Sequence, residues 1–331
     1  MAVLFVTHDA FASHDTGPRH PERADRLVAL RAGVDAAGLG DALVEVEAPL
    51  APIDALLAVH EAPMVERVRL ACAAGVDLDP DTPCVPPSWE AAQRAAGAGL
   101  EAVARLSEGP ERVAFCAVRP PGHHATTRTA MGFCLFNNVA VTARALADRG
   151  ERVLIADIDA HHGNGTQDAF YDDPRVLFVS WHQSPLYPGS GALAETGAGA
   201  GEGTTVNVPL PQGTTGDVYR EVIDRVLVPA VERFDPTWLL VSAGFDAHRD
   251  DPLTSMGLTS GDYADIMADL LELTGVPVVA FLEGGYDLAA VASAGAATIG
   301  ALVGERLHPE RPTAGGPGAT VVDRLVEQRR R

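Results

Sequence analysis

Two aspartates and a histidine alternate at the end of an apolar run in the segment VLIADIDAHHGNG, residues 153 to 165. In an extended strand, side chains two residues apart project from the same face, so Asp157, Asp159 and His161 would share one face. Carboxylate and imidazole groups bind divalent metals, and Asp159 and His161 could close on one ion. Asp157 would then be free to orient a neighbouring group.

A third possible metal ligand, Asp246, follows the run VSAG at 241–244, which has the character of a strand end. Together with Asp159 and His161 it would supply two carboxylates and one imidazole. Three protein ligands leave a position open for water and substrate, which is typical of catalytic rather than structural metal sites. Zinc fits this ligand set, and Fe(II) is the alternative.

Groups suited to proton transfer lie in two other segments. His123 and His124 follow the rigid turn PPG at 120–122, and an imidazole with a pKa of about 6.5 can exchange protons at neutral pH. Asp157 could hold one of the two histidines in its charged form. Tyr286 follows two glycines, and its hydroxyl could donate a hydrogen bond to a developing oxyanion. The sequence therefore supplies metal ligands, a candidate general base and a candidate oxyanion donor.

These segments follow apolar runs that alternate with helical patterns or polar loops. Strands that alternate with helices predict a mostly parallel sheet covered on both faces, and ligand sites in such sheets form beyond the carboxyl ends of the strands. Helical spacing predicts one helix with Pro21 in its first turn and others over 62–74 and 88–107. The apolar runs that predict strands cover residues 2–6, 112–118, 152–158, 175–181, 204–210, 237–243 and 276–282.

The composition is typical of an ordinary globular protein, with 47% hydrophobic and 21% charged residues. The formal net charge of −20 disfavours nucleic-acid partners, because phosphate backbones bind clustered positive charge. The cysteines form no CxxC pair, and no signal peptide or membrane-spanning apolar stretch is present, so we expect a cytoplasmic protein without membrane contact. We expect the tail from about residue 305 to be loosely held.

Four motifs, PPGHHA, DIDAHHGNGTQ, GFDAHRDDPL and EGGY, occur in this order and together resemble the signatures of the histone deacetylase superfamily. HPERADRL near the start resembles its class II branch. Asn164, where class I members carry aspartate, and the glutamate of EGGY place the chain closer to class II-like bacterial deacetylases and acetylpolyamine amidohydrolases. The resemblance covers residues 1–305, which we expect to form the catalytic domain, followed by a tail over 306–331.

This resemblance implies an arginase-like, three-layer α/β fold with a central, mostly parallel eight-stranded sheet. It also implies a zinc-dependent amidohydrolase whose ligands are the three residues identified above. His124 would act as general base and then as general acid for the leaving amine. His123, paired with Asp157, would lend electrostatic support, and Tyr286 would stabilise the oxyanion.

The resemblance further implies a substrate channel and structural potassium sites. Gly132 would accept the substrate amide N–H, Asp81 would orient the substrate at the rim, and Arg23 would lie below the site, where the family passes acetate. The channel residues would be Gly132, Phe133, Tyr187, Leu253, Asp81 and Arg23. An inner potassium ion would contact Asp157, Asp159, His161, Ser180 and Trp181, and an outer one would lie near Phe170, Asp173, Val176 and Thr204.

Three activities follow from the resemblance: removal of acetyl or other acyl groups from lysine, hydrolysis of acetylpolyamines, and an arginase-like ureohydrolase reaction. Leu253 stands where the polyamine-preferring eukaryotic branch has an acidic gatekeeper, which favours acyl-lysine. A two-manganese ureohydrolase needs further carboxylates, but Gly163 and His248 stand at those positions. The expected partner is an acylated lysine in a protein or peptide, or a small acetylated amine. Acyl chain length and assembly into a homo-oligomer stay open, and His162 receives no role.

Overall fold

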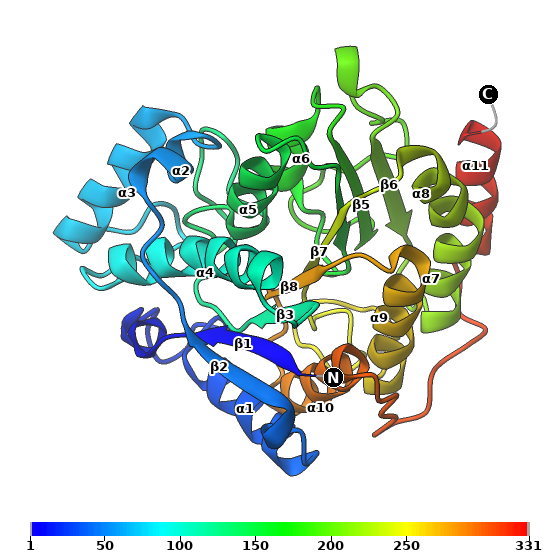
Figure 1. Cartoon of the computed structure of the whole chain (residues 1–331), viewed down its shortest axis with the longest axis horizontal. Coiled ribbons are helices and arrows are strands. Elements are labelled where there is room, and N and C mark those ends of the chain that lie inside the picture. The colour runs from blue at the N-terminus through cyan, green and yellow to red at the C-terminus, as the bar shows by residue number, and fades with distance from the viewer. Residues whose placement is uncertain (1, 330–331) are drawn as a thin grey trace.

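Eight parallel strands form one sheet in the order β2-β1-β3-β8-β7-β4-β5-β6 (Figure 1). The structure, a computed structural model, describes residues 2–329. The sheet is parallel throughout, as the alternation of strands and helices predicts. The strands are β1 (Val3–Thr7), β2 (Leu43–Glu47), β3 (Val113–Cys116), β4 (Val153–Asp157), β5 (Val176–Gln183), β6 (Thr205–Leu210), β7 (Trp238–Ala243) and β8 (Val278–Leu282).

Alternate side chains of β1, β3, β8, β7, β4 and β5 enter two separate hydrophobic cores, one on each face of the sheet. In β4, Leu154 and Ala156 lie in one core, whereas Val153 and Ile155 lie in the other. Strands buried on both faces are almost continuously apolar, which is why the parallel strands stand out in the sequence. The predicted three-layer α/β architecture is confirmed.

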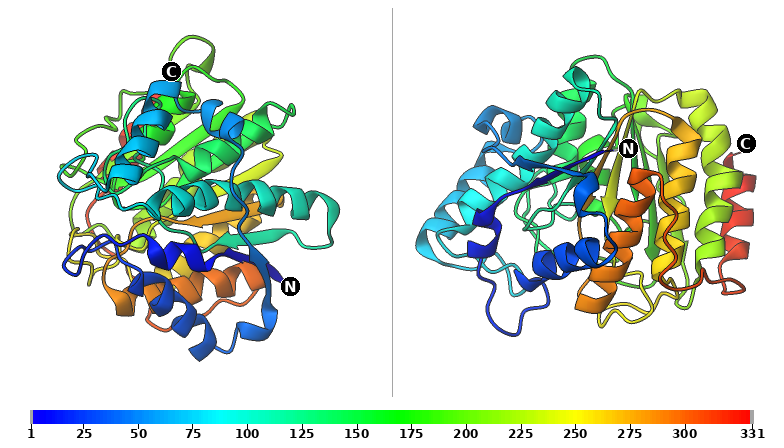
Figure 2. Two further views of the ribbon diagram at one scale, coloured as in Figure 1. Left: turned by 90° about the vertical axis from the view of Figure 1, so that its left-hand side faces the viewer. Right: turned by 60° about the horizontal axis from the view of Figure 1, so that its bottom comes forward.

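Helices cover both faces of the sheet (Figures 1 and 2). α1 and α10 pack together against one face, and α4 and α5 pack against the other. Within residues 2–329, no helix is both long enough and apolar enough to cross a membrane. The helices are α1 (Asp25–Ala36), α2 (Ile53–Leu57), α3 (Ala62–Ala74), α4 (Ser88–Glu108), α5 (Asn138–Ala147), α6 (Asn164–Phe170), α7 (Gly216–Val222), α8 (Val228–Phe234), α9 (Ser260–Thr274), α10 (Leu288–Val303) and α11 (Ala319–Arg329), with a π-helical segment (Ile223–Leu227) between α7 and α8.

Each predicted apolar run overlaps a strand, but none of the runs covers β2. It lies at the edge of the sheet and fully buries one side chain, that of Val46, so it lacks a continuous apolar pattern. The helices expected over 62–74 and 88–107 are confirmed as α3 and α4. α1 begins only at Asp25, so the expectation that Pro21 lies in its first turn is wrong.

The segment that follows α10 packs on the rest of the protein, so the expectation of a loosely held tail is wrong. α11 buries Val322 and Leu325 in the hydrophobic core on one face of the sheet. Before it, Oε2 of Glu310 lies 2.8 Å from Nε2 of the buried His248. Burial of apolar side chains and pairing of a buried histidine therefore stabilise the position of this segment on the domain. The last two residues of the expected tail, 330 and 331, lie outside the described residues.

Candidate active site

The polar segments that follow β3, β4, β7 and β8 meet at one edge of the sheet. β3 pairs with β8, β8 with β7, and β7 with β4, so these four strands are consecutive neighbours. Parallel strands deliver the loops after them to the same edge. The histidine pair, the metal-ligand segment, the Asp246 segment and the tyrosine loop therefore come together, as the sequence predicts.

Asp159, His161 and Asp246 form one buried group. Their candidate ligand atoms lie within 4.8 Å of one another, and Nδ1 of His161 is 3.1 Å from Oδ1 of Asp159 and 2.9 Å from Oδ2 of Asp246. Burial disfavours the charged imidazole, but Asp246 and Asp159 raise the pKa of His161 to about 10. A divalent cation would replace this proton and balance the two buried carboxylates more fully. The donor set fits zinc.

Backbone N–H groups hold the two ligand carboxylates in place. Asp159 accepts from the N–H of His161 and from that of Gly284, each at 2.8 Å, and Asp246 accepts from the N–H of Ala160 at 2.7 Å. A Cβ at Gly284 would lie 2.2 Å from Oδ2 of Asp246, so only glycine lets the β8 loop approach this closely. Such donors orient carboxylates for ligation before an ion arrives.

His123 and His124 lie side by side, with ring centroids 4.1 Å apart, but differ in proton affinity. Nδ1 of His123 donates to Oδ2 of Asp157 at 3.1 Å. Burial disfavours its charged form, yet Asp159 and Asp157 raise the pKa of His123 well above its ordinary value. Burial and the charge of His123 lower the pKa of His124 well below its ordinary value. The pair thus offers one charged imidazole and one neutral imidazole that can take a proton.

Asn164, the first residue of α6, sets the tautomer of His124. Its Oδ1 accepts from Nδ1–H of His124 at 2.7 Å. Its amide nitrogen donates to the carbonyl oxygen of His124 and to Sδ of Met131, which fixes the orientation of the amide. Because Nδ1 carries the proton, Nε2 of His124 is the basic nitrogen.

Tyr286 enters the site from the loop after β8. Its backbone N–H donates to Oδ2 of Asp251 at 2.7 Å, and Oδ1 of the same carboxylate accepts from the N–H of Leu253 at 2.9 Å. The ring packs edge-on against Phe133, with centroids 5.7 Å apart, and the guanidinium of Arg26 lies 5.2 Å from its centroid. Burial and nearby carboxylates raise the pKa of Tyr286, so its hydroxyl keeps its proton and can donate a hydrogen bond.

A buried ion cluster supports the tyrosine loop. Glu22 lies between Arg119 and Arg26, with Oε2 2.7 Å from Nη2 of Arg119 and Oε1 3.1 Å from Nη1 of Arg26. Burial disfavours a carboxylate, but Arg119 and Arg26 lower the pKa of Glu22 to about 2. Nε of Arg26 donates to the carbonyl oxygen of Gly285 at 2.6 Å, so the cluster fixes the backbone beside Tyr286.

Arg26 and Arg119 are the buried arginines of this region. The prediction that placed Arg23 below the site is wrong. The side chain of Arg23 is 42% exposed and pairs with an exposed aspartate. Arg26 is fully buried and shares the inner face of α1 with Leu30 and Val34, at helical spacing. Arg23 precedes the helix, so the start of α1 decides which arginine turns inward.

Gly132 and Phe133 form a turn beside His124. Both have left-handed backbone conformations, with φ of 57° and 68°, and a Cβ at Gly132 would lie 2.6 Å from the imidazole of His124. The N–H of Phe133 donates to Oγ1 of Thr82 at 3.2 Å, and that hydroxyl donates to Asp81 at 3.0 Å. Asp81 thus supports the strained turn, since a left-handed non-glycine residue needs firm neighbours.

Tyr187 and Leu253 are each 40% exposed to solvent. The ring of Tyr187 packs edge-on against His124, with centroids 5.2 Å apart. Leu253 belongs to the loop that Asp251 ties to Tyr286. All predicted channel residues except Arg23 therefore lie around the histidine pair and the tyrosine.

The residues assigned to potassium ions fall into two groups, and both assignments stay predictions. On the inner side, Asp157 and Ser180 are register partners on β4 and β5. On the outer side, the carboxylate of Asp173 already pairs with Arg144 and Arg175, each at 2.7 Å. The inner group comprises Asp157, Asp159, His161, Ser180 and Trp181, and the outer group comprises Phe170, Asp173, Val176 and Thr204.

His162 has partners of its own and contacts none of the three metal ligands among its hydrogen bonds. Its ring nitrogens contact Oγ of Ser190 at 2.9 Å and Oε1 of Gln167 at 3.1 Å, and burial lowers its pKa to about 4. It is a neutral, structural histidine.

Gly163 leaves no room for a second catalytic metal. A Cβ at this position would lie 2.1 Å from Oδ2 of Asp157, so the carboxylate that such a metal would need cannot be accommodated there.

Glu283 receives no structural role from the sequence, yet it organises the site. Its Oε2 accepts from the N–H groups of Gly122 and His123, at 2.6 and 3.2 Å. Burial raises its pKa to about 7. A glutamate directly after the apolar run of β8 is the signal that could have found it, because a carboxylate at the end of a buried strand must itself be buried and bonded.

Comparisons with known proteins agree with this geometry. Residues 20–302 match the family described as histone deacetylase domain. The chain is 39% identical to a probable deacetylase of Archaeoglobus fulgidus, over 87% of this chain and 82% of that protein. It is 45% identical to the chloroplastic histone deacetylase 14 of Arabidopsis thaliana, over 64% of this chain but only 52% of that protein. The crystal structure of the HDA15 HD domain superposes with a TM-score of 0.90 at 34% identity, covering 98% of this chain and 94% of that one.

The parallel three-layer fold with a buried Asp-His-Asp group at the carboxyl edge of the sheet defines an α/β protein with a candidate catalytic metal site. The chain belongs to the histone deacetylase family. It is a deacetylase, as the family match and the deacetylase relatives show.

Proposed function

We propose that the protein is a zinc-dependent amidohydrolase that removes acetyl groups from lysine side chains, with Fe(II) as the alternative metal. The observation that carries this proposal is the buried group of Asp159, His161 and Asp246. Nearby, burial lowers the pKa of His124 and raises that of Tyr286, which favours a neutral imidazole and a protonated hydroxyl. When bound, the metal would supply a Lewis acid that activates water and polarises the scissile carbonyl.

The histidine pair would move the proton. His124, with Nδ1–H held by Asn164, takes a proton at Nε2 from the attacking water and passes it to the leaving amine. His123, held in its charged form by Asp157, supports the negative charge that develops. Tyr286 donates its O–H to the oxyanion, and one such donor is typically worth about 3 kcal/mol.

The entrance favours acyl-lysine as the substrate. Leu253 is apolar and exposed where the site opens, so it offers no carboxylate to the second cation of a polyamine. Phe133 and Tyr187 would flank the aliphatic stem of lysine, and the carbonyl of Gly132 would accept the amide N–H. Acetylpolyamine hydrolysis is the second candidate, because Asp81 could supply a negative charge for the second cation of a polyamine. Asp81 lies close to Tyr187: burial is the main cause that raises the pKa of Tyr187, and the charge of Asp81 is the next.

A substrate panel on zinc-loaded protein tests the proposal. We expect an acetyl-lysine peptide to be hydrolysed faster than longer acyl-lysines and faster than acetylated putrescine or spermidine. A chelator should abolish activity and added zinc should restore it, while His124→Ala should abolish activity with metal present. Arg23→Ala is the control, because its side chain lies at the surface and should leave the rate unchanged. Activity that survives both chelation and His124→Ala would contradict the mechanism, and preference for acetylspermidine would favour the second candidate.

A further inference from the structure

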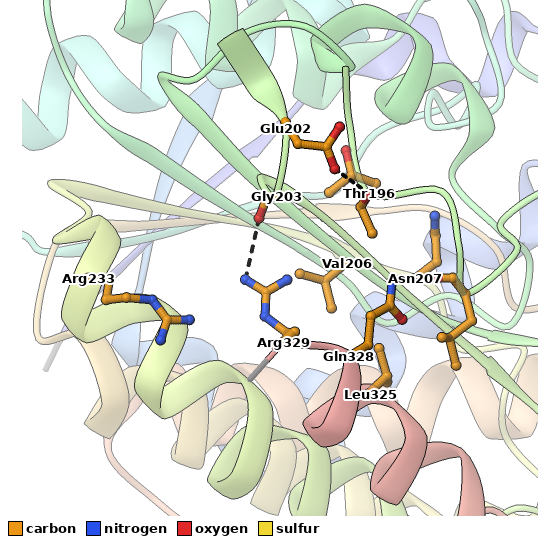
Figure 3. A pocket seen from close by; sticks show the side chains of 11 residues that line it. Thr196, Glu202, Gly203, Val206, Asn207, Arg233, Leu325, Gln328 and Arg329 are labelled. Carbon is orange, nitrogen blue, oxygen red and sulfur yellow. Dashed lines mark hydrogen bonds between the residues drawn. The ribbon is translucent and has the colours of Figure 1, made fainter. Parts of the chain in front are cut away.

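A cavity of about 380 Å³ lies at the edge of the sheet, between β6 and α11 (Figure 3). It shares no lining residue with the active site. Arg233 from α8 and Arg329 from α11 line it, together with the apolar side chains of Leu193, Val206 and Leu325. A concave space with an apolar wall and a few convergent charged groups has the composition of a small-molecule site.

Arg233 and Arg329 form no ion pair with any residue in the described part of the chain. Arg329 donates to the carbonyl oxygen of Gly203 at 3.3 Å, and its buried Nε has no hydrogen-bond partner. Figure 3 shows the two guanidinium groups close to each other. Burial and the charge of Arg233 lower the pKa of Arg329, so the two cations repel each other.

Among residues 2–329, no carboxylate pairs with either arginine. Glu202 is the acidic residue of the cavity lining, but it accepts a hydrogen bond from Thr196 at 2.7 Å, away from Arg233 in Figure 3. Arg225, in an adjoining cavity of about 240 Å³ that both arginines also line, differs because Glu221 and Asp323 neutralise it. Two unbalanced positive charges therefore face a cavity in a chain whose net charge is −20.

We propose that this cavity binds a small phosphate monoester, with the phosphate between Arg233 and Arg329 and the organic body against the apolar wall. A phosphate monoester carries a charge of about −1.5 to −2 at pH 7, which balances two guanidinium groups, whereas a carboxylate would balance one. The planar guanidinium also presents paired N–H donors that match phosphate oxygens. The apolar wall of Leu193, Val206 and Leu325 would cover a ring or chain on the ligand.

Isothermal titration calorimetry on the zinc-loaded full chain tests this site, with phenyl phosphate as the probe. Benzoate has the same ring with a single charge, and inorganic phosphate has the charge without the ring, so both should bind at least tenfold more weakly. Arg233→Gln and Arg329→Gln should each weaken phenyl phosphate binding at least tenfold. Arg225→Gln removes the same charge from a balanced arginine and should change binding less than twofold.

Binding that Arg225→Gln weakens as much as Arg233→Gln would overturn the proposal, because it would reflect general charge. Binding that Arg233→Gln leaves unchanged and that chelation abolishes would also overturn it, because the phosphate would then be held at the metal. Benzoate binding as tightly as phenyl phosphate would assign the cavity to carboxylates instead. Arg233 is exposed, so Arg233→Gln should fold normally. If Arg329→Gln loosens α11, the result with Arg233→Gln alone decides the test.

Discussion

Replacing Asn164 by aspartate should move the pH dependence of deacetylation to higher pH. Oδ1 of Asn164 lies 2.7 Å from Nδ1 of His124, and burial and the charge of His123 hold the pKa of His124 well below its ordinary value. A carboxylate at this position would attract the protonated ring, which an amide does not. Aspartate is close to asparagine in shape, so the substitution changes charge with little change in packing.

The size of this shift follows from the short distance. Two unit charges about 4 Å apart, at an effective dielectric constant of about 20, attract each other by about 4 kcal/mol, or about 3 pKa units. Desolvation of the new carboxylate offsets part of this, so we expect His124 to gain about 1 to 2 pKa units. His124 must be neutral to take a proton, so the rate falls as the pH drops through its pKa. A higher pKa therefore moves the acidic limb upward.

The assay is kcat/KM for an acetyl-lysine peptide from about pH 5 to 9, which reports the ionisation of the free enzyme. The zinc-loaded wild type and Asn164→Asp are compared, with Asn164→Ala as the matched control. Alanine removes the acceptor without adding a charge, so it should lower the rate without moving the acidic limb upward. An acidic limb that stays in place in Asn164→Asp would refute the conclusion that this side chain controls the basicity of His124.

Three further substitutions test the supports of the site. Tyr286→Phe should lower kcat by about 100- to 1000-fold with little change in KM, because it removes one oxyanion donor. A fall in KM as large as the fall in kcat would contradict this role of Tyr286. Asp251→Asn should lower the free energy of unfolding in urea by about 1 to 3 kcal/mol and also lower kcat, since the tyrosine loop loses a buried acceptor. Glu22→Gln should cost about 3 kcal/mol at pH 7, because the pKa of Glu22 is lowered from 4.5 to about 2 in the folded protein. That contribution is complete above pH 4.5 and disappears as the pH falls to about 2. The free energy of unfolding in urea should therefore differ between wild type and variant much more at pH 7 than at about pH 2.5. An equal difference at both pH values would contradict the pairing.

The metal group could be predicted from the sequence because its spacing is local. Asp159 and His161 are two residues apart after one apolar run, and Asp246 comes soon after another, so a parallel sheet necessarily brings them to one edge. Arg26 could not be separated from Arg23 in the same way. Which of them is buried depends on where α1 starts, and no turn residue marks that point clearly.

Hydrogen bonds between segments far apart in the sequence could not be predicted from local sequence patterns either. Asp251 binds two backbone N–H groups, one of them in the loop after β8, and this contact depends on the neighbouring positions of β7 and β8. β2 was missed for a different reason, because an edge strand with one buried side chain resembles a loop in its composition. Tertiary contacts, rather than residue types, carry this part of the information.

α11 has a consequence for how the protein is made and handled. It is encoded after all eight strands, yet Val322 and Leu325 complete the core beside β6, the last strand at that edge of the sheet. On the ribosome, this apolar surface therefore stays uncovered until after the whole catalytic site has been synthesised. A chain cut at residue 302, where the family match ends, would keep that surface exposed for good, and apolar patches beside an edge strand promote aggregation. Expression trials should accordingly keep residues 303–329, even though no catalytic residue lies there.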